Sequence, residues 1–235
     1  MTRHAQLNNV EHRDLRIITT SSAQYGDDVM GAITFPAEFR NLQAHYPIVF
    51  KQASDGVIAP LALFGFREKQ NLFLKDPGWD AYYIPLMIER QPFLIGRSNT
   101  GEVVHVDLDS PRVSKTEGVP MFLEHGGNTD YLERVSNVLG MIHDGIAATP
   151  AFVNALIDNN LLESFALDLK FRDGAEFRFT GFHCIQEERL AKLDAAALGK
   201  LHEKGYLQAI YMVIASFSNF RDLIERASKL DADQR

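Results

Sequence analysis

The chain has 235 residues, of which 46% are hydrophobic and 23% are charged, a composition typical of a folded, soluble globular protein. It carries 31 acidic and 24 basic residues, and the formal net charge of −7 repels nucleic-acid backbones and anionic lipid headgroups. Its single cysteine, Cys184, excludes an internal disulfide and a cysteine-based zinc or iron–sulfur centre. We therefore expect a protein that binds no nucleic acid and needs no oxidation to fold.

The apolar stretches of the chain are short. Its first residues contain no apolar run that could serve as the core of a signal peptide, so we expect a cytoplasmic protein. The longest apolar runs, Ile58 to Phe66 and Tyr82 to Ile88, fall short of the roughly 18 residues that a membrane-spanning helix needs. We expect no membrane insertion, which excludes a permease.

The first half of the chain, about residues 1–125, has the pattern of an antiparallel β-rich lobe. Short apolar runs rich in β-branched and aromatic residues alternate with turn sequences such as Asp55-Gly56. Pro60 and Pro85 mark bulges or edges, because proline cannot donate to a β-ladder. The predicted strands are residues 48–51, 57–66, 72–74, 82–89, 93–96 and 103–109.

The second half, about residues 126–235, has the pattern of a helical lobe. After Gly126-Gly127 the apolar period changes from two to about 3.6, and Thr129 is a suitable N-cap. Thr149-Pro150 resembles the start of a second helix, since proline is tolerated at the first helical position. We therefore predict two helices that pack as a hairpin.

A β-hairpin and two more helices complete the predicted fold. Apolar residues alternate from Phe165 to Phe179 around a turn at Asp173-Gly174. Asp194 caps a short helix that ends near Gly205, and a longer helix over residues 207–229 packs inside the chain or forms a homodimer seam. The sequence thus predicts an α+β fold in a single domain, 1–235, with both lobes in one cooperative unit.

Motifs for nucleotide or acyl chemistry are absent from the sequence. It contains no GxGxxG, no phosphate-binding GxxxxGK loop and no GxSxG elbow. Cys184 follows His183 directly, and neighbours on a strand point to opposite faces, so Cys184 is interpreted as a small core residue. Asp27-Asp28 is interpreted as a solvated turn, and the segment from His12 to Arg16 as polar and terminal.

One pair of residues suggests metal chemistry. His105 and Asp107 share a strand face, as two ligands of a 2-His-1-carboxylate iron site would. A solvated strand face is the alternative interpretation. The third ligand could be His125, His143 or His183, and an arginine that holds the 2-oxoglutarate carboxylate could be Arg97, Arg112 or Arg178.

The densest aromatic segment of the chain runs from Trp79 to Phe93. It holds the only tryptophan, two adjacent tyrosines and two prolines, with a nearby arginine. Aromatic rings at this density either pack in the core or stack on a ligand. The candidate ligand-binding residues are Trp79, Tyr82, Tyr83, Arg90 and Phe93.

Short segments along nearly the whole chain match the pattern of one known family. The first group is Phe39-Arg-Asn-Leu42, His45-Tyr-Pro-Ile-Val-Phe50, Asn71-Leu-Phe-Leu74, Gly78-Trp-Asp-Ala-Tyr-Tyr-Ile-Pro85 and Arg90-Gln-Pro-Phe93. The second group is Leu161-Leu-Glu163, Gly181-Phe-His183, Glu187-Glu-Arg-Leu190, Gly205-Tyr-Leu207, Ile210-Tyr211 and Ser216-Phe-Ser-Asn219. Together these segments resemble the SapC family of bacterial proteins. None of them is a catalytic signature, and the family pattern does not include His105.

The resemblance implies a link to bacterial surface layers, and similar proteins are often encoded beside TonB-dependent receptors and flavin-dependent halogenase-like proteins. With the missing chemistry motifs, it favours a non-enzymatic cytoplasmic binding or accessory protein linked to outer-membrane uptake. Such a protein would hold a peptide, a modified amino acid or a partner protein, without a cofactor. Two alternatives stay open: an iron- and 2-oxoglutarate-dependent oxygenase that uses His105 and Asp107, and a structural surface-layer protein.

Overall fold

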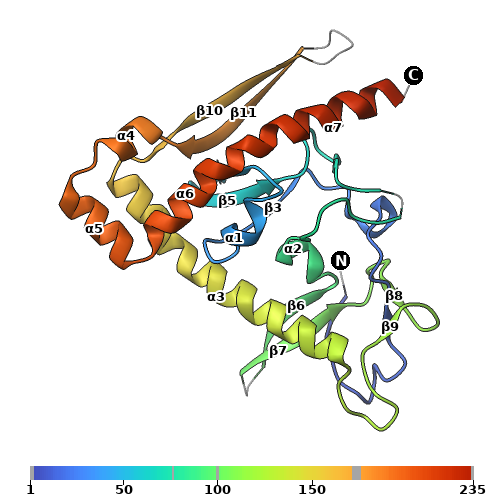
Figure 1. Cartoon of the computed structure of the whole chain (residues 1–235). Coiled ribbons are helices and arrows are strands. Elements are labelled where there is room, and N and C mark those ends of the chain that lie inside the picture. Colours follow the sequence, from blue (N-terminus) through green and yellow to red (C-terminus); the bar gives the residue numbers. More distant parts are fainter. Residues whose placement is uncertain (1–2, 76, 99–100, 171–175, 234–235) are drawn as a thin grey trace. The chain divides into compact units, whose positions relative to one another are not determined.

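A computed structural model describes residues 3–75, 77–98, 101–170 and 176–233 (Figure 1). The chain forms two compact units, each assembled from separate stretches of sequence. The first unit comprises Met1–Asp27, Leu74–Asp80 and Leu86–Asp144, and the second comprises Asp28–Phe73, Ala81–Pro85 and Gly145–Arg235. Antiparallel sheets together with helices confirm the predicted α+β class, whereas the single cooperative domain stays a prediction.

The first unit contains two small antiparallel sheets. One has the order β1 (His4–Gln6), β7 (Gly101–Asp107), β6 (Phe93–Ser98). The other has the order β8 (Val113–Ser114), β2 (Arg16–Ile17), β9 (Val119–Pro120). The unit also holds a 3₁₀ turn, η1 (Ala23–Tyr25), and a short helix, α2 (Leu86–Glu89).

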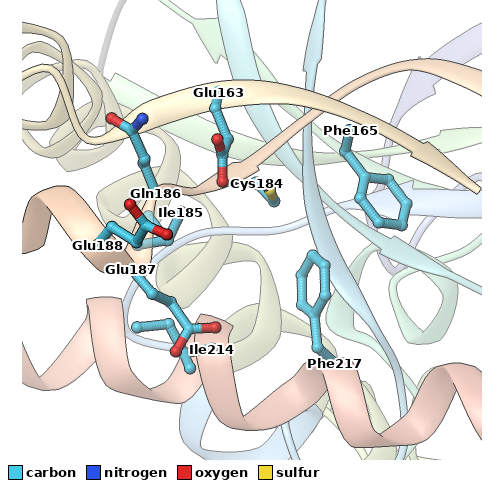
Figure 2. A pocket seen from close by; sticks show the side chains of 9 residues that line it. All are labelled: Glu163, Phe165, Cys184, Ile185, Gln186, Glu187, Glu188, Ile214 and Phe217. Carbon is cyan, nitrogen blue, oxygen red and sulfur yellow. Dashed lines mark hydrogen bonds between the residues drawn. The ribbon is translucent and has the colours of Figure 1, made fainter.

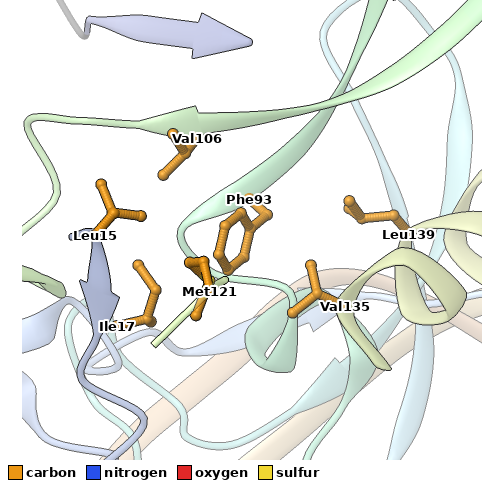
Figure 3. Packing of buried hydrophobic residues seen from close by; sticks show 7 residues of the cluster. All are labelled: Leu15, Ile17, Phe93, Val106, Met121, Val135 and Leu139. Carbon is orange, nitrogen blue, oxygen red and sulfur yellow. The ribbon is translucent and has the colours of Figure 1, made fainter. Parts of the chain in front are cut away.

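The core of the first unit is a cluster of buried apolar side chains from both sheets and the long helix α3 (Asp130–Asp158) (Figure 3). Its members are Leu15, Ile17, Phe93, Val106, Met121, Val135 and Leu139. The helix begins as predicted, because the Thr129 hydroxyl accepts a hydrogen bond from the Leu132 amide at 3.3 Å. Val135 and Leu139, four residues apart, lie on the same helical face.

The second unit contains a five-stranded antiparallel sheet in the order β10-β11-β4-β5-β3. Its strands are β3 (Gly31–Ile33), β4 (Ile48–Gln52), β5 (Ile58–Leu63), β10 (Leu162–Lys170) and β11 (Glu176–Ile185). Its helical elements are α1 (Phe39–Leu42), α4 (Glu187–Ala191), α5 (Ala195–Glu203), α6 (Tyr206–Ser216), the 3₁₀ turn η2 (Phe217–Asn219) and α7 (Phe220–Asp233). Helix α6 packs against β4 and β11, and its Ser216 hydroxyl accepts a hydrogen bond from the Ile48 amide at 2.9 Å.

Aromatic side chains fill the core of the second unit. Phe152, from the second half of α3, is fully buried, and its ring lies 6.0 Å from that of Phe39 and 5.4 Å from that of Tyr206. Gly145 allows α3 to approach Phe35, because a Cβ at this position would lie only 2.2 Å from the phenylalanine ring. Phe152 thereby joins α3 to α1 and α6 within this unit.

The predicted helical hairpin is wrong, because α3 continues through Thr149 and Pro150 to Asp158. Proline has no N–H to donate to the carbonyl four residues earlier. Thr149 does not act as a cap, since its hydroxyl instead donates to the Gly145 carbonyl of the same helix at 2.7 Å. Packing on both sides of Phe152 holds the helix together across the proline.

Two predicted strands and one predicted helix also differ from the structure. Residues 82–89 form no strand, since α2 begins at Leu86 directly after Pro85, and residues 72–74 contribute only an isolated bridge between Leu74 and Trp79. The helix predicted at 207–229 is divided by η2 into α6 and α7. The other predicted strands are confirmed, although the one predicted at 57–66 ends at Leu63. The cap at Asp194 and the β-hairpin are also confirmed, while the hairpin turn at Asp173-Gly174 lies outside the described residues.

Candidate functional site

Three residues of the predicted aromatic site lie in the first unit. Trp79 is half-buried and its backbone bridges that of Leu74. Phe93 is fully buried in the core cluster, where its ring lies 6.4 Å from that of Tyr131. Arg90 donates a hydrogen bond to the Phe93 carbonyl at 2.7 Å, and burial lowers the pKa of its guanidinium. These contacts tie Trp79, Arg90 and Phe93 to other residues of the first unit.

The other two residues lie in the second unit. Tyr82 is fully exposed, with its ring 6.1 Å from that of His45. The Tyr83 hydroxyl donates to the buried carboxylate of Glu38 at 3.0 Å, and Glu38 also accepts from the Thr34 hydroxyl at 2.6 Å. The five candidate residues are thus divided between the two units, and their joint role in binding a ligand stays a prediction.

His105 and Asp107 lie on β7 as predicted, but each has local contacts. The His105 ring covers Gly96 on the neighbouring strand, where a Cβ would lie 2.2 Å from the imidazole. Asp107 accepts a hydrogen bond from the Asp109 amide at 3.1 Å, an Asx-type turn contact. Among the residues that the structure describes, no three histidine, cysteine or acidic side chains are grouped closely enough to hold a metal ion.

The solvated turn predicted at Asp27-Asp28 is wrong for Asp27, which is 0% exposed and forms a buried ion pair with Arg112, itself 4% exposed. Asp27 also accepts from the Ser22 amide at 2.9 Å. Arg112 donates to two carbonyls, of Ile18 at 2.9 Å and Thr20 at 3.1 Å. This arginine was a candidate for holding 2-oxoglutarate, but its guanidinium ties together loops of its own unit.

A pocket of about 430 Å³ lies in the second unit between the β10–β11 hairpin, the start of α4 and helix α6. Figure 2 shows side chains from these elements around it. Its floor and walls include the rings of Phe165 and Phe217, whose centroids lie 5.3 Å apart in an edge-to-face arrangement. The residues that line it are Glu163, Phe165, Cys184, Ile185, Gln186, Glu187, Glu188, Ile214 and Phe217.

The pocket is acidic. Glu163, Glu187 and Glu188 line it, and the lining includes no lysine, arginine or histidine. Lys192, which directly follows α4, approaches Glu188 with 3.9 Å between Nζ and Oε2, but both side chains are largely exposed and such pairs contribute little. Three carboxylates beside two phenylalanine rings form an environment that favours an organic cation.

Cys184 lies beside Glu163, with 3.9 Å between its sulfur and the nearer carboxylate oxygen. It is half-buried and faces the pocket, so its interpretation as a simple core residue was wrong. Burial raises the pKa of the thiol to about 11, and the Glu163 carboxylate adds to the rise. The thiol is therefore protonated at neutral pH and is a poor nucleophile.

A second hollow of similar size in the same unit, about 440 Å³, is lined without any charged residue. It lies between α3 and the ends of β3 and β5, and four exposed apolar side chains border it: Ile33, Val57, Ile146 and Ile157. Its polar groups are few, and the Thr149 hydroxyl is already bonded within α3. It offers apolar area but little to orient a ligand.

The sequence contained a partial signal for the acidic pocket. Glu163 and Phe165 are two residues apart on a strand and therefore share a face, and Glu187-Glu188 follows the return strand. What the sequence did not reveal was the register, which pairs Glu163 with Cys184 across the hairpin. That pairing brings the two acidic segments to one hollow.

One comparison with known proteins gave a match. The model of the SapC family matches residues 7–223, nearly the whole chain. Neither a search of curated proteins nor a search of solved structures gave a match. Within the described parts of the chain, no helix has the length and apolar character to cross a membrane. On the extent of the family match, the chain belongs to the SapC family.

Proposed function

We propose that this member of the SapC family is a cytoplasmic binding or accessory protein whose acidic pocket holds a basic side chain of a peptide or partner protein. The observation that carries the proposal is the pocket lining: three glutamates, two phenylalanine rings and no basic residue. A guanidinium or ammonium group entering the pocket gains the carboxylates as partners while its aliphatic stem packs on the rings.

The size of the pocket suits this occupant. Ligand sites in proteins occupy roughly 300–1,000 Å³, and a volume of about 430 Å³ accommodates one long side chain and part of its neighbour. Arginine is the better fit of the two basic residues, because its planar guanidinium forms bidentate bonds with carboxylates and stacks on aromatic faces. Glu163 on β10 and Glu188 on α4 reach the hollow from different elements.

Enzymatic chemistry is not part of the proposal. The one nucleophilic side chain of the pocket, Cys184, has a pKa raised to about 11 and is neutral at physiological pH. The carboxylates that raise this pKa further would also repel an anionic substrate. Both features suit recognition of a cation better than covalent chemistry at the sulfur.

The experiment is a titration of the protein with the blocked pentapeptide Val-Thr-Arg-Thr-Val, followed by nuclear magnetic resonance or fluorescence anisotropy. We expect saturable binding that shifts the signals of pocket residues, and loss of binding when the central arginine is replaced by glutamate. A Glu187→Gln, Glu188→Gln double variant should weaken binding about tenfold, which corresponds to roughly 1.4 kcal/mol.

The matched control is a Glu203→Gln, Glu225→Gln double variant. It changes the net charge by the same amount at two exposed glutamates of the same unit that do not line the pocket. This control should bind the arginine peptide like the unaltered protein. If both double variants weaken binding equally, the attraction arises from overall charge and the pocket is not the site.

A further inference from the structure

Strand β10 lies at one edge of the five-stranded sheet in the second unit. Within the described part of the chain, the sheet order places β11 on one side of β10 and no strand on the other (Figure 1). Glu163, Ser164 and Ala166 on this strand are exposed. An edge of this kind presents backbone N–H and C=O groups that another extended chain can pair with.

The register of β10 shows which of its backbone groups face β11 and which face outward. Leu161 lies opposite Gln186, and the Gln186 amide donates to the Leu161 carbonyl at 2.9 Å. Bonded and non-bonded pairs alternate in an antiparallel ladder, so Glu163 and Phe165 direct their backbone groups towards β11. The backbone groups of Leu162 and Ser164 therefore point outward from the sheet.

The same stretch of β10 supplies side chains to the acidic pocket. Glu163 and Phe165 both line it, whereas Ser164 between them does not. Figure 2 shows Glu163 and Phe165 projecting from the strand towards helix α6. A strand added at the outer edge would lie about 4.8 Å from β10 and place alternate side chains on this same face. The side chain opposite Glu163 would then stand at the pocket.

The charge of the edge argues for a basic partner over a second copy of this chain. Glu163 and Asp168 on β10 are both exposed, and pairing two copies of the strand would bring acidic side chains together. A register shift between Phe165 and Leu167 also divides the ladder with β11, so Leu162 to Phe165 form one short regular stretch and pairing resumes at Leu167. A short extended peptide with one basic residue satisfies both conditions.

We propose that the occupant of the acidic pocket is an extended peptide segment that adds a strand to the outer edge of β10, with its basic side chain opposite Glu163. This inference rests on the proposed function and specifies how the partner is held. Backbone bonds to Leu162 and Ser164 give affinity without regard to sequence, and the pocket selects the basic residue.

Backbone methylation of the pentapeptide Val-Thr-Arg-Thr-Val tests the inference. An N-methyl group keeps every side chain but removes one backbone donor and blocks close approach on that side. One peptide is methylated at both threonine nitrogens and another at the arginine nitrogen. We expect a loss of affinity of tenfold or more for one of these two peptides and little change for the other, because only alternate residues face β10.

In antiparallel pairing the threonine N–H groups face β10, so the peptide methylated at both threonines should lose affinity. In parallel pairing the arginine N–H faces β10, so the peptide methylated at arginine should lose affinity. Either result supports strand addition. Strand addition is wrong if the two methylated peptides bind equally well, whether both keep or both lose affinity. The proposed function then still stands, provided that exchange of arginine for glutamate abolishes binding. If the unmodified peptide does not bind, both proposals fail.

A substitution in the protein gives an independent test. Ser164→Pro removes the outward N–H at a position where an edge strand tolerates proline. We expect the variant to fold, as judged by circular dichroism, and to bind the unmodified peptide about tenfold more weakly. Ser164→Ala keeps the N–H and should lose much less affinity than Ser164→Pro. Unchanged affinity in a folded Ser164→Pro variant would overturn the inference.

Discussion

The two units use charged residues in opposite ways. In the first unit, Asp27 and Arg112 are buried against each other and against backbone groups, so both charges are compensated within the fold. In the second unit, Glu163, Glu187 and Glu188 surround a hollow without a basic residue in its lining. The difference separates charges that hold the structure together from charges that meet a partner in the proposed function.

Removing the cation of the buried pair should have the largest effect on stability. Arg112→Met leaves the Asp27 carboxylate buried without its partner, which typically destabilises a protein by about 3–5 kcal/mol. Urea unfolding with linear extrapolation measures this loss. Arg178→Met breaks an exposed pair with Asp168, 3.6 Å apart, and serves as the control with an expected loss below about 1 kcal/mol. Equal losses for the two variants would show that the buried pair is not a structural clamp.

The adjacent tyrosines of the second unit, Tyr82 and Tyr83, should also differ in how much their substitution lowers stability. Tyr83→Phe removes a hydroxyl that donates to the buried Glu38, and we expect a loss of about 1–2 kcal/mol in the free energy of unfolding. Tyr82→Ala changes a fully exposed ring and should alter stability by less than about 0.5 kcal/mol. A loss of peptide or partner binding in the Tyr82 variant alone would support the ligand role that the sequence predicts for it.

The pH dependence of Cys184 tests the environment of the pocket. Its folded-state pKa of about 11 lies above the ordinary value of 9.0, so the thiol binds its proton more tightly in the folded protein. The resulting contribution to stability is fully present below pH 9 and is lost as the pH rises through about 11. Alkylation by iodoacetamide should therefore be slow at neutral pH and rise towards pH 11 in the native protein.

Glu163→Gln should move that alkylation profile to lower pH. The profile should not reach that of an ordinary thiol, because burial is the larger cause of the shift and Glu163 the smaller. Cys184→Ser controls for reaction elsewhere in the chain. A profile already half-maximal near pH 8 would mean that the thiol is neither buried nor beside a carboxylate.

Local patterns in the sequence predicted much of the fold. Thr129 and Asp194 cap helices as their positions indicated, and the alternation around Phe165 and Phe179 predicted the β10–β11 hairpin. Each of these features depends on residues that are close in sequence. The SapC family was predicted from short segments spread along the chain and is confirmed by the family match.

The errors arose where distant contacts override local preference. Pro150 predicted a helix start, but packing around Phe152 carries α3 through it. Asp27 resembled a solvated turn residue because its partner, Arg112, lies 85 positions away. The acidic pocket depends on the pairing of Glu163 with Cys184, which no local pattern specifies.

The most direct test of the proposed function is a charge-swap cycle between the pocket and the peptide. The protein and its Glu187→Lys, Glu188→Lys variant are each titrated with Val-Thr-Arg-Thr-Val and with the peptide that carries glutamate at its centre. We expect the native pocket to bind the arginine peptide at least tenfold more tightly than the glutamate peptide, and the variant to reverse this preference. If the protein and its variant prefer the same peptide, so that the changes in protein and peptide act independently, the proposed pocket is not the binding site.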